Sequence, residues 1–374
     1  MIYLDNAATG GFKPHAVSDA VISATRYLLA NPGRSGHRLS IMGAEIVSSA
    51  RCLASELFDT SSDRVIFTKN CTEALNVAIF GTLKKGGHVI TTVYEHNSVL
   101  RPLFALEKNG LIRLDVVSPE NDKNICECIE EKISPDTYMI ISTAVSNVTG
   151  EVLPVADIGA IAKKHSLLYV VDGAQGGGHV RLDLKQNNIN ILALAGHKGL
   201  YGIMGSGLLI FDENTEIEPL LYGGTGTETF NLSSPLPYPE SLEAGTLNLP
   251  AIASLKESLN YVKTNFTTFS EYLTLSSAKL IERLRNIDGV TTYSIPNPAG
   301  IVSFSTKNYE STDFADILNK EYDIAVRGGF HCAPLMHKFL GTEKGGLVRC
   351  SLAVQNSDGE IRYFCESVKK ILSR

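Results

Sequence analysis

Short runs of apolar residues, bounded by polar or glycine-rich segments, recur from residue 65 onward. They predict buried strands at 65–67, 89–92, 114–117, 138–142, 167–172, 189–195 and 207–211. Apolar residues spaced three or four apart predict helices between them, at 70–80, 98–108, 124–133 and 155–164. This alternation favours an α/β fold with a mixed, mostly parallel sheet covered by helices. Ligands of such sheets bind at the carboxyl ends of the strands.

The remaining pattern predicts a second, smaller unit. Helices are expected after Pro14, over 41–58 and over 251–285. A stretch rich in glycine, proline and serine, 223–250, lacks strong periodicity and is interpreted as a possible functional loop. Strands near 301–305 and 324–326 indicate an α+β unit. We therefore expect a large domain at 13–250, and a small α+β domain made of 251–374 together with the N-terminal segment 1–12.

Composition narrows the function classes. The chain has 374 residues, of which 44% are hydrophobic and 20% charged, and its net charge is −6. This balance gives no reason to expect nucleic acid or a membrane as partner, and no apolar run reaches the ~18 residues of a membrane span. The start of the chain lacks the pattern of a signal peptide. Together these features predict a cytoplasmic protein.

The cysteines agree with that compartment. Seven cysteines at scattered spacings favour free thiols over a disulfide framework. The pair Cys126 and Cys128 has no partner pair at zinc spacing, so we expect two thiols on a helix and no metal site. Apolar contexts place Cys52, Cys350 and Cys365 in the core.

The strand at 189–195 ends at Gly196-His197-Lys198. A lysine in such a turn is ordinarily a solvated side chain. The other interpretation is a Schiff-base lysine for pyridoxal 5′-phosphate (PLP), which needs further groups to hold the ring and the phosphate of the cofactor.

Candidates for those groups follow other predicted strands. Asp172 could keep the ring nitrogen protonated, although a helix N-cap is the alternative. Gln175 could donate to the phenolic oxygen. Thr72 lies at a predicted helix start, where backbone N–H groups suit a phosphate, but simple capping is also common there. His96 could stack on the ring and move protons, or be an ordinary loop histidine.

A substrate clamp is predicted at Arg349, which lies in an apolar, strand-like context. Its planar fork matches a carboxylate, although an internal ion pair is an equal alternative. Asn147, after another predicted strand, could add a donor. Each of these signals is weak alone, but together they fall at successive strand ends.

Longer motifs give a resemblance to a known family. The segments 172–175, 196–198 and 243–248 (Asp-Gly-Ala-Gln, Gly-His-Lys and Glu-Ala-Gly-Thr-Leu-Asn) resemble those of class V aminotransferases. The segments 3–8, 34–37 and 327–333 are similar to those of the group II cysteine desulfurase and selenocysteine lyase branch. The resemblance implies a homodimer of PLP-dependent fold type I, with two active sites at the subunit interface.

The resemblance also implies roles for individual residues. Lys198 would carry PLP, with His96 stacked on the ring, Asp172 at the ring nitrogen and Gln175 at the phenolic oxygen. The residues implied at the phosphate are Cys71, Thr72 and His197, with Thr246 reaching in from the partner subunit. The residues implied at the amino-acid substrate are Asn147 and Arg349 at its carboxylate, and Arg34 and His37 near the mouth of the site.

The implied reaction converts L-cysteine or L-selenocysteine to L-alanine. A Cys332 thiolate would attack the substrate sulfur and become a persulfide, with His331 and Arg327 as candidates that help the thiol to ionise. From the residues alone, Cys332 is as readily a buried small side chain. A class V aminotransferase or β-lyase that does not use Cys332, and a catalytically idle PLP-binding subunit, stay open as alternatives.

Two departures from the family pattern bear on substrate and partner. Ala195 replaces a serine that relatives usually direct at the phosphate, and the Cys332 loop begins Gly328-Gly-Phe-His. Pro334 follows closely, so the loop is short and stiff. A persulfide on it could not travel far, and we expect a separate sulfur-acceptor protein to approach it.

Overall fold

The computed structural model describes residues 1–28, 30–120, 122–226, 230–232 and 237–374. Its largest element is a seven-stranded sheet in the order β2-β8-β7-β6-β5-β3-β4. The strands are β2 (Val65–Thr68), β3 (Gly87–Thr92), β4 (Ile112–Val117), β5 (Thr137–Thr143), β6 (Leu168–Asp172), β7 (Ile191–Ala195) and β8 (Gly207–Phe211). Strand β8 pairs antiparallel with both β2 and β7, and the other pairs are parallel. The prediction of a mixed, mostly parallel sheet is confirmed.

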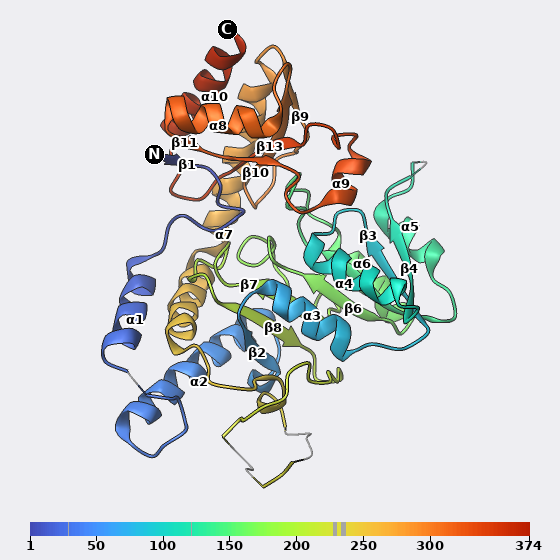
Figure 1. Cartoon of the computed structure of the whole chain (residues 1–374), viewed down its shortest axis with the longest axis vertical. Helices are drawn as coiled ribbons and strands as arrows, with labels where there is room; N and C mark the ends of the chain where they lie inside the picture. Colours follow the sequence, from blue (N-terminus) through green and yellow to red (C-terminus); the bar gives the residue numbers. More distant parts are fainter. Residues whose placement is uncertain (29, 121, 227–229, 233–236) are drawn as a thin grey trace.

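Helices cover both faces of this sheet (Figure 1). The helices of the large unit are α1 (His15–Arg26), α2 (Arg38–Phe58), α3 (Cys71–Gly81), α4 (Asn97–Lys108), α5 (Ile125–Lys132) and α6 (Val155–Lys164). Neighbouring strand residues point to opposite faces, so Val170 packs in one apolar cluster and Val171 in the other. Strands buried on both sides explain why their sequences are continuous apolar runs.

A second unit is built on a four-stranded antiparallel sheet in the order β12-β13-β10-β9. Its strands are β9 (Val290–Thr292), β10 (Ile301–Thr306), β12 (Arg327–Gly329) and β13 (Leu347–Ser351). A parallel pair joins β1 (Ile2–Tyr3) to β11 (Ile324–Ala325), so the N-terminal segment lies against this unit. Helices α8 (Ser311–Tyr322), α9 (Pro334–Phe339) and α10 (Asp358–Leu372) complete it.

Helix α7 (Leu249–Arg285) runs between the two units (Figure 1). Leu255 and Leu259 in its first half pack in a core cluster of the large sheet, whereas Leu280 and Leu284 in its second half pack in the core of the small unit. The division of the chain into domains stays a prediction. Parts of the segment 223–250, namely 227–229 and 233–236, lie outside the described residues.

Local sequence signals account for several helix starts. The Asn70 side chain caps α3 by accepting a hydrogen bond from the backbone N–H of Glu73, and Asn124 and Ser357 form capping boxes at α5 and α10. None of the described helices combines the length and the apolarity that a membrane span requires. The prediction that Cys52 is buried is wrong, because α2 turns this thiol toward solvent.

A buried ion pair fixes the segment before α7. The Arg51 guanidinium donates to both carboxylate oxygens of Glu243, at 3.0 and 2.5 Å, and lies 4.7 Å from the ring centroid of Phe67. The same carboxylate accepts a hydrogen bond from the backbone N–H of Phe67 at 2.7 Å. Burial raises the pKa of Glu243, and the nearby Arg51 charge opposes that rise. The ionised form of Glu243 therefore depends on its pairing with Arg51.

We expect Arg51→Met to lower the free energy of unfolding by about 3 kcal/mol, because it leaves the Glu243 charge buried without a partner. Denaturant unfolding measures this loss. Adding Glu243→Gln removes the stranded charge and should restore much of the stability. If the double variant loses the sum of the two single losses, the pair is not coupled and the explanation is wrong.

Candidate functional site

The predicted site residues at the strand ends come together. Thr143 at the end of β5 pairs in register with Asp172 at the end of β6, and β7 ends next to them at Ala195. A pocket lies at this edge. Its lining includes these of the predicted residues: Cys71, Thr72, His96, Asn147, Asp172, Gln175, His197 and Lys198. The expected convergence at carboxyl strand ends is therefore seen in the geometry.

Asp172 is 2% exposed and its carboxylate is held on one side. Its Oδ1 accepts hydrogen bonds from the backbone N–H of Ala174 at 2.9 Å and from the Cys71 thiol at 3.4 Å. Gln175 donates from Nε2 to the Ala7 carbonyl at 2.8 Å, which fastens the N-terminal segment over the pocket. Two donors on one oxygen orient the carboxylate and leave Oδ2 to meet a ligand.

Lys198 lies in the turn after β7, half-buried at the pocket. Burial lowers the pKa of its amine, while the charges of Asp172 and Cys71 oppose the fall. The preceding residue is fixed, because the His197 carbonyl accepts from the backbone N–H of Gly10 at 2.9 Å and from Lys13 Nζ at 3.2 Å. A desolvated amine with a lowered pKa is the kind that attacks a carbonyl carbon.

The starts of two helices meet beside the pocket. Thr72 in the first turn of α3 shares a hydrogen bond of 2.7 Å with the Ser98 hydroxyl at the start of α4. His96 is the N-cap of α4, and its Nδ1 accepts from the backbone N–H of Ser98 at 3.0 Å. Burial lowers the pKa of His96 to about 4, so its imidazole is neutral near pH 7.

Arg349 on β13 is 1% exposed and contacts two other segments of the chain. Its Nη2 pairs with Asp5 Oδ1 at 3.0 Å, and its Nη1 donates to the Asn147 carbonyl at 3.0 Å. The predicted alternative of an internal ion pair is thus present. Two buried atoms, Arg349 Nε and Asn147 Oδ1, have no hydrogen-bond partner among the described residues.

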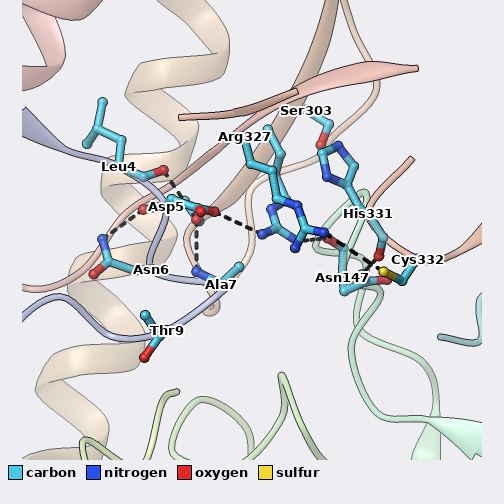
Figure 2. Close-up of polar contacts among 12 residues, drawn as sticks. Leu4, Asp5, Asn6, Ala7, Thr9, Asn147, Ser303, Arg327, His331 and Cys332 are labelled. Atoms are coloured by element: carbon cyan, nitrogen blue, oxygen red, sulfur yellow. Dashed lines mark hydrogen bonds and ion pairs between the residues drawn. The ribbon is translucent and has the colours of Figure 1, made fainter. Parts of the chain in front are cut away.

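Cys332 is exposed on the loop between β12 and α9, and this loop is tied to the pocket wall (Figure 2). Its carbonyl accepts from the backbone N–H of Asn97 at 2.7 Å, and the carbonyl of His331 accepts from Asn147 Nδ2 at 2.7 Å. His331 and Cys332 have φ angles of 48° and 58°, a conformation that non-glycine residues rarely adopt. Such strain is kept where the surrounding contacts over-determine it.

The two residues expected to assist Cys332 behave differently. Arg327 Nη2 lies 3.9 Å from the Cys332 sulfur, close enough to stabilise a thiolate. The prediction for His331 is not supported by its surroundings: its Nε2 contacts the Leu347 carbonyl at 3.1 Å, and burial lowers its pKa to about 2. A buried neutral imidazole that is turned toward β13 supplies no positive charge to the thiol.

Five predicted residues do not line this pocket in the single chain. Arg349 and the Cys332 loop are hydrogen-bonded to Asn147 in its wall, whereas the other three lie farther away. Thr246 is exposed and lines a different, apolar groove. Arg34 lines another depression near Gly226. His37 is exposed and caps α2 by accepting from the backbone N–H of Ser40 at 3.3 Å.

Sequence reasoning missed three polar groups around the pocket. Asp5 pairs with Arg349, Lys13 donates to the His197 carbonyl, and Glu95 is fully buried beside Thr143. Asp5 lies in the segment 3–8 noted above, and Glu95 directly precedes His96, which was assigned a role. The signal that could have found them is a charged residue beside a predicted pocket residue, since a buried charge needs a partner.

The donor set fits PLP. It offers the Lys198 amine for the aldehyde, the buried Asp172 carboxylate for the ring nitrogen, and the first turn of α3, at Cys71 and Thr72, for the phosphate. The unpartnered Asn147 Oδ1 shows that the pocket has polar capacity that the described residues do not satisfy.

Comparisons with known proteins agree with this fit. The class-V aminotransferase family model matches residues 2–364. A probable cysteine desulfurase from Methanothermobacter thermautotrophicus is 32% identical, over 99% of this chain and 94% of that protein. A cysteine desulfurase from Salmonella agona is 29% identical, over 96% of this chain and 91% of that protein.

Solved structures show the same similarity. The apo cysteine desulfurase of Thermococcus onnurineus NA1 has a TM-score of 0.93 at 30% identity, and the match covers 100% of this chain and 94% of that one. The Escherichia coli cysteine desulfurase CsdA in its S-sulfonic acid form has a TM-score of 0.90 at 25% identity, with 99% and 94% covered. The predicted PLP fold type I is confirmed, and the chain belongs to the class V aminotransferase family.

Proposed function

We propose that this protein is a PLP-dependent cysteine desulfurase that converts L-cysteine to L-alanine and takes the sulfur onto Cys332. The observation that carries the proposal is an exposed thiol whose residue is fastened, through its carbonyl, to Asn97 at the start of α4. The neighbours of Asn97, His96 and Ser98, line the pocket suited to PLP. The relatives named cysteine desulfurase support this activity over transamination or β-elimination.

Bound PLP withdraws electrons from the substrate carbon and so eases removal of its proton. Lys198 is the residue placed to hold the cofactor and then, with its amine released, to remove the proton from the substrate Cα. Asp172, whose Oδ1 already accepts two hydrogen bonds, would hold the ring nitrogen of PLP and keep it protonated. Cys71, Thr72 and His197 are assigned to the phosphate, and Gln175 to the phenolic oxygen.

Substrate binding is assigned to the other side of the pocket. Arg349 Nε is a buried donor without a partner among the described residues, which suits the substrate carboxylate. Asn147 is assigned beside it as the sequence predicts, although its Nδ2 also donates to the His331 carbonyl. His96 lines the pocket. Its Nδ1 accepts from the backbone N–H of Ser98, so the neutral imidazole carries its proton on Nε2, from which it can donate a hydrogen bond to the substrate. Arg34 and His37 are assigned to the mouth of the site.

The sulfur step uses the Cys332 thiolate as nucleophile. An S–S bond forms between Cys332 Sγ and the substrate sulfur, and the C–S bond breaks with its electron pair left on the carbon skeleton. That carbon then takes a proton to give alanine. The carbonyls of His331 and Cys332 both accept hydrogen bonds from the large unit, and these bonds hold the loop in place. The persulfide therefore stays near the pocket, and a thiol-bearing acceptor protein has to approach it.

We further propose that the protein acts as a homodimer in the cytoplasm. An apolar groove of about 470 Å³ is lined by Leu220, Leu221 and Thr246, and the two leucines are 44% and 57% exposed. A second copy seated there would cover this apolar surface and bring Thr246 toward the neighbouring pocket. The free thiols of the described chain fit a reducing compartment.

Leu221→Asp tests the dimer. A charge buried in an apolar contact is costly, so we expect the variant to sediment as a monomer and to bind PLP at least tenfold more weakly. Analytical ultracentrifugation and PLP titration measure the two effects. Met204→Asp, which replaces a side chain that is 70% exposed outside the residues lining this groove, serves as the control. A dimeric Leu221→Asp with unchanged PLP affinity would exclude the groove as the interface.

Arg327→Gln tests the activation of Cys332. Two unit charges about 4 Å apart attract in water by an energy equivalent to about a fivefold shift in an equilibrium. We therefore expect alkylation of Cys332 to slow by about that factor at neutral pH. The exposed Cys52 thiol in the same molecule is the internal control. Peptide mass spectrometry follows both rates, and equal slowing of both thiols would contradict the assignment.

Cys332→Ala and Lys198→Ala test the function directly. We expect Cys332→Ala to keep the absorbance of bound PLP but to lose at least a hundredfold in alanine release from L-cysteine. Lys198→Ala should lose both. Cys52→Ala is the matched thiol control and should be unaffected. L-selenocysteine is assayed beside L-cysteine, because its weaker carbon–selenium bond lessens the need for the thiol. Unchanged alanine release from L-cysteine by Cys332→Ala would refute the desulfurase assignment.

A further inference from the structure

Glu95 is a fully buried carboxyl group in the turn between β3 and α4. Its Oε1 accepts hydrogen bonds from the Thr92 hydroxyl at 2.6 Å and from the backbone N–H of Thr143 at 3.0 Å. Thr92 is the last residue of β3 and Thr143 the last of β5, so the carboxyl group bridges the ends of two adjacent parallel strands. His96 follows directly in the chain.

The surroundings of Glu95 contain no cation to pair with it among the described groups that interact with it. The titratable groups that face it from the neighbouring strand β6 are Asp172 and Tyr169, and Asp172 carries a charge of the same sign. The second carboxyl oxygen, Oε2, is buried and has no hydrogen-bond partner within the described part of the chain. An ionised group in this position would be an unpaired buried charge, which proteins avoid.

We propose that Glu95 is a positioning residue: as a neutral carboxylic acid it fastens the turn that carries His96 to the end of β5, and it leaves Asp172 to hold the carboxylate charge at these strand ends. Oε1 already accepts two hydrogen bonds, which places the proton on Oε2. Burial, with Asp172 adding to it, raises the pKa of Glu95 to about 8, in the same direction as the geometry.

Two neighbouring carboxyl groups at these strand ends, Glu95 behind the pocket and Asp172 in its lining, thereby have different protonation states. A second negative charge beside Asp172 would compete with Asp172 for its two cationic partners, the ring nitrogen of PLP and the Lys198 amine. The bearing of Glu95 on the reaction rests on the proposed function, since it acts through His96 and Asp172. The protonation of Glu95 does not rest on the proposed function, because it follows from the contacts of Glu95 alone.

Glu95→Gln tests the protonation, since the amide matches the neutral acid in shape and in its acceptor oxygen. The unfolded carboxyl group loses its proton near pH 4.5, whereas the folded one keeps it to about pH 8. The wild type should therefore lose stability relative to Glu95→Gln as the pH rises between these values, by about tenfold in the unfolding constant per pH unit. Above about pH 8 the difference should level off.

The measurement is denaturant unfolding of both proteins, with excess PLP, at a series of pH values. The difference infrared spectrum should also show the carbonyl band of a protonated acid that Glu95→Gln lacks. A stability difference independent of pH, a missing band, or a Glu95→Gln chain that does not fold would each overturn the neutral acid. Neither measurement uses turnover, so these outcomes are independent of whether Cys332→Ala supports the proposed function.

Glu95→Ala tests the positioning. It removes the acceptor that joins the turn to β5, so we expect the absorbance of bound PLP to shift or weaken at neutral pH, whereas Glu95→Gln keeps the wild-type spectrum. Circular dichroism confirms that each variant is folded before the spectra are compared. A Glu95→Ala spectrum identical to the wild type would show that Glu95 does not position His96.

Discussion

The candidate site depends on a buried guanidinium that joins three distant parts of the chain. Arg349 belongs to the small sheet, Asp5 to the N-terminal segment, and Asn147 to the loop after β5 in the large sheet. Removing a guanidinium from water costs several kcal/mol unless its partners are in place. The three segments therefore have to meet in one arrangement before Arg349 is satisfied, and that arrangement also fixes the loop on which Cys332 lies.

Burial acts on the bases of the pocket in one direction. It lowers the pKa of His96 and His197 to about 4, so both imidazoles are neutral near pH 7, and it also lowers the pKa of the Lys198 amine. Neutral bases accept protons and attack carbonyl carbons, which the protonated forms cannot do. The low-dielectric pocket at the strand ends is thus a chemical requirement as well as a consequence of packing.

Much of the large unit was predictable, because its strands are continuous apolar runs and its helices have clear apolar periods. The convergence of Asp172, His96 and Lys198 followed from one rule, that parallel strands end at a common edge. Asp5 and Arg349 are so far apart in the sequence that no periodic pattern predicts their contact. The orientation of the His331 ring was also hidden, since it depends on the conformation of its loop.

Helix ends and faces were less predictable for a similar reason. Cys52 stands among apolar residues in the sequence, but the helix rotates each successive residue by about 100°, and the face toward the core excludes it. The short strand β12 (Arg-Gly-Gly) carries no apolar side chain, so only its pairing with β13 defines it. Contacts between residues that are far apart in the sequence are the hardest to predict from it.

Helix α7 has a mechanical consequence for the way ligands reach the pocket. It contains 37 residues without an internal break, and at about 1.5 Å per residue it extends about 55 Å. Its two halves are embedded in different cores, so it acts as a rigid strut between them. Rotation of the small sheet away from the large one would require bending this strut. Movements of side chains and of the short loops around the pocket would leave this strut unbent.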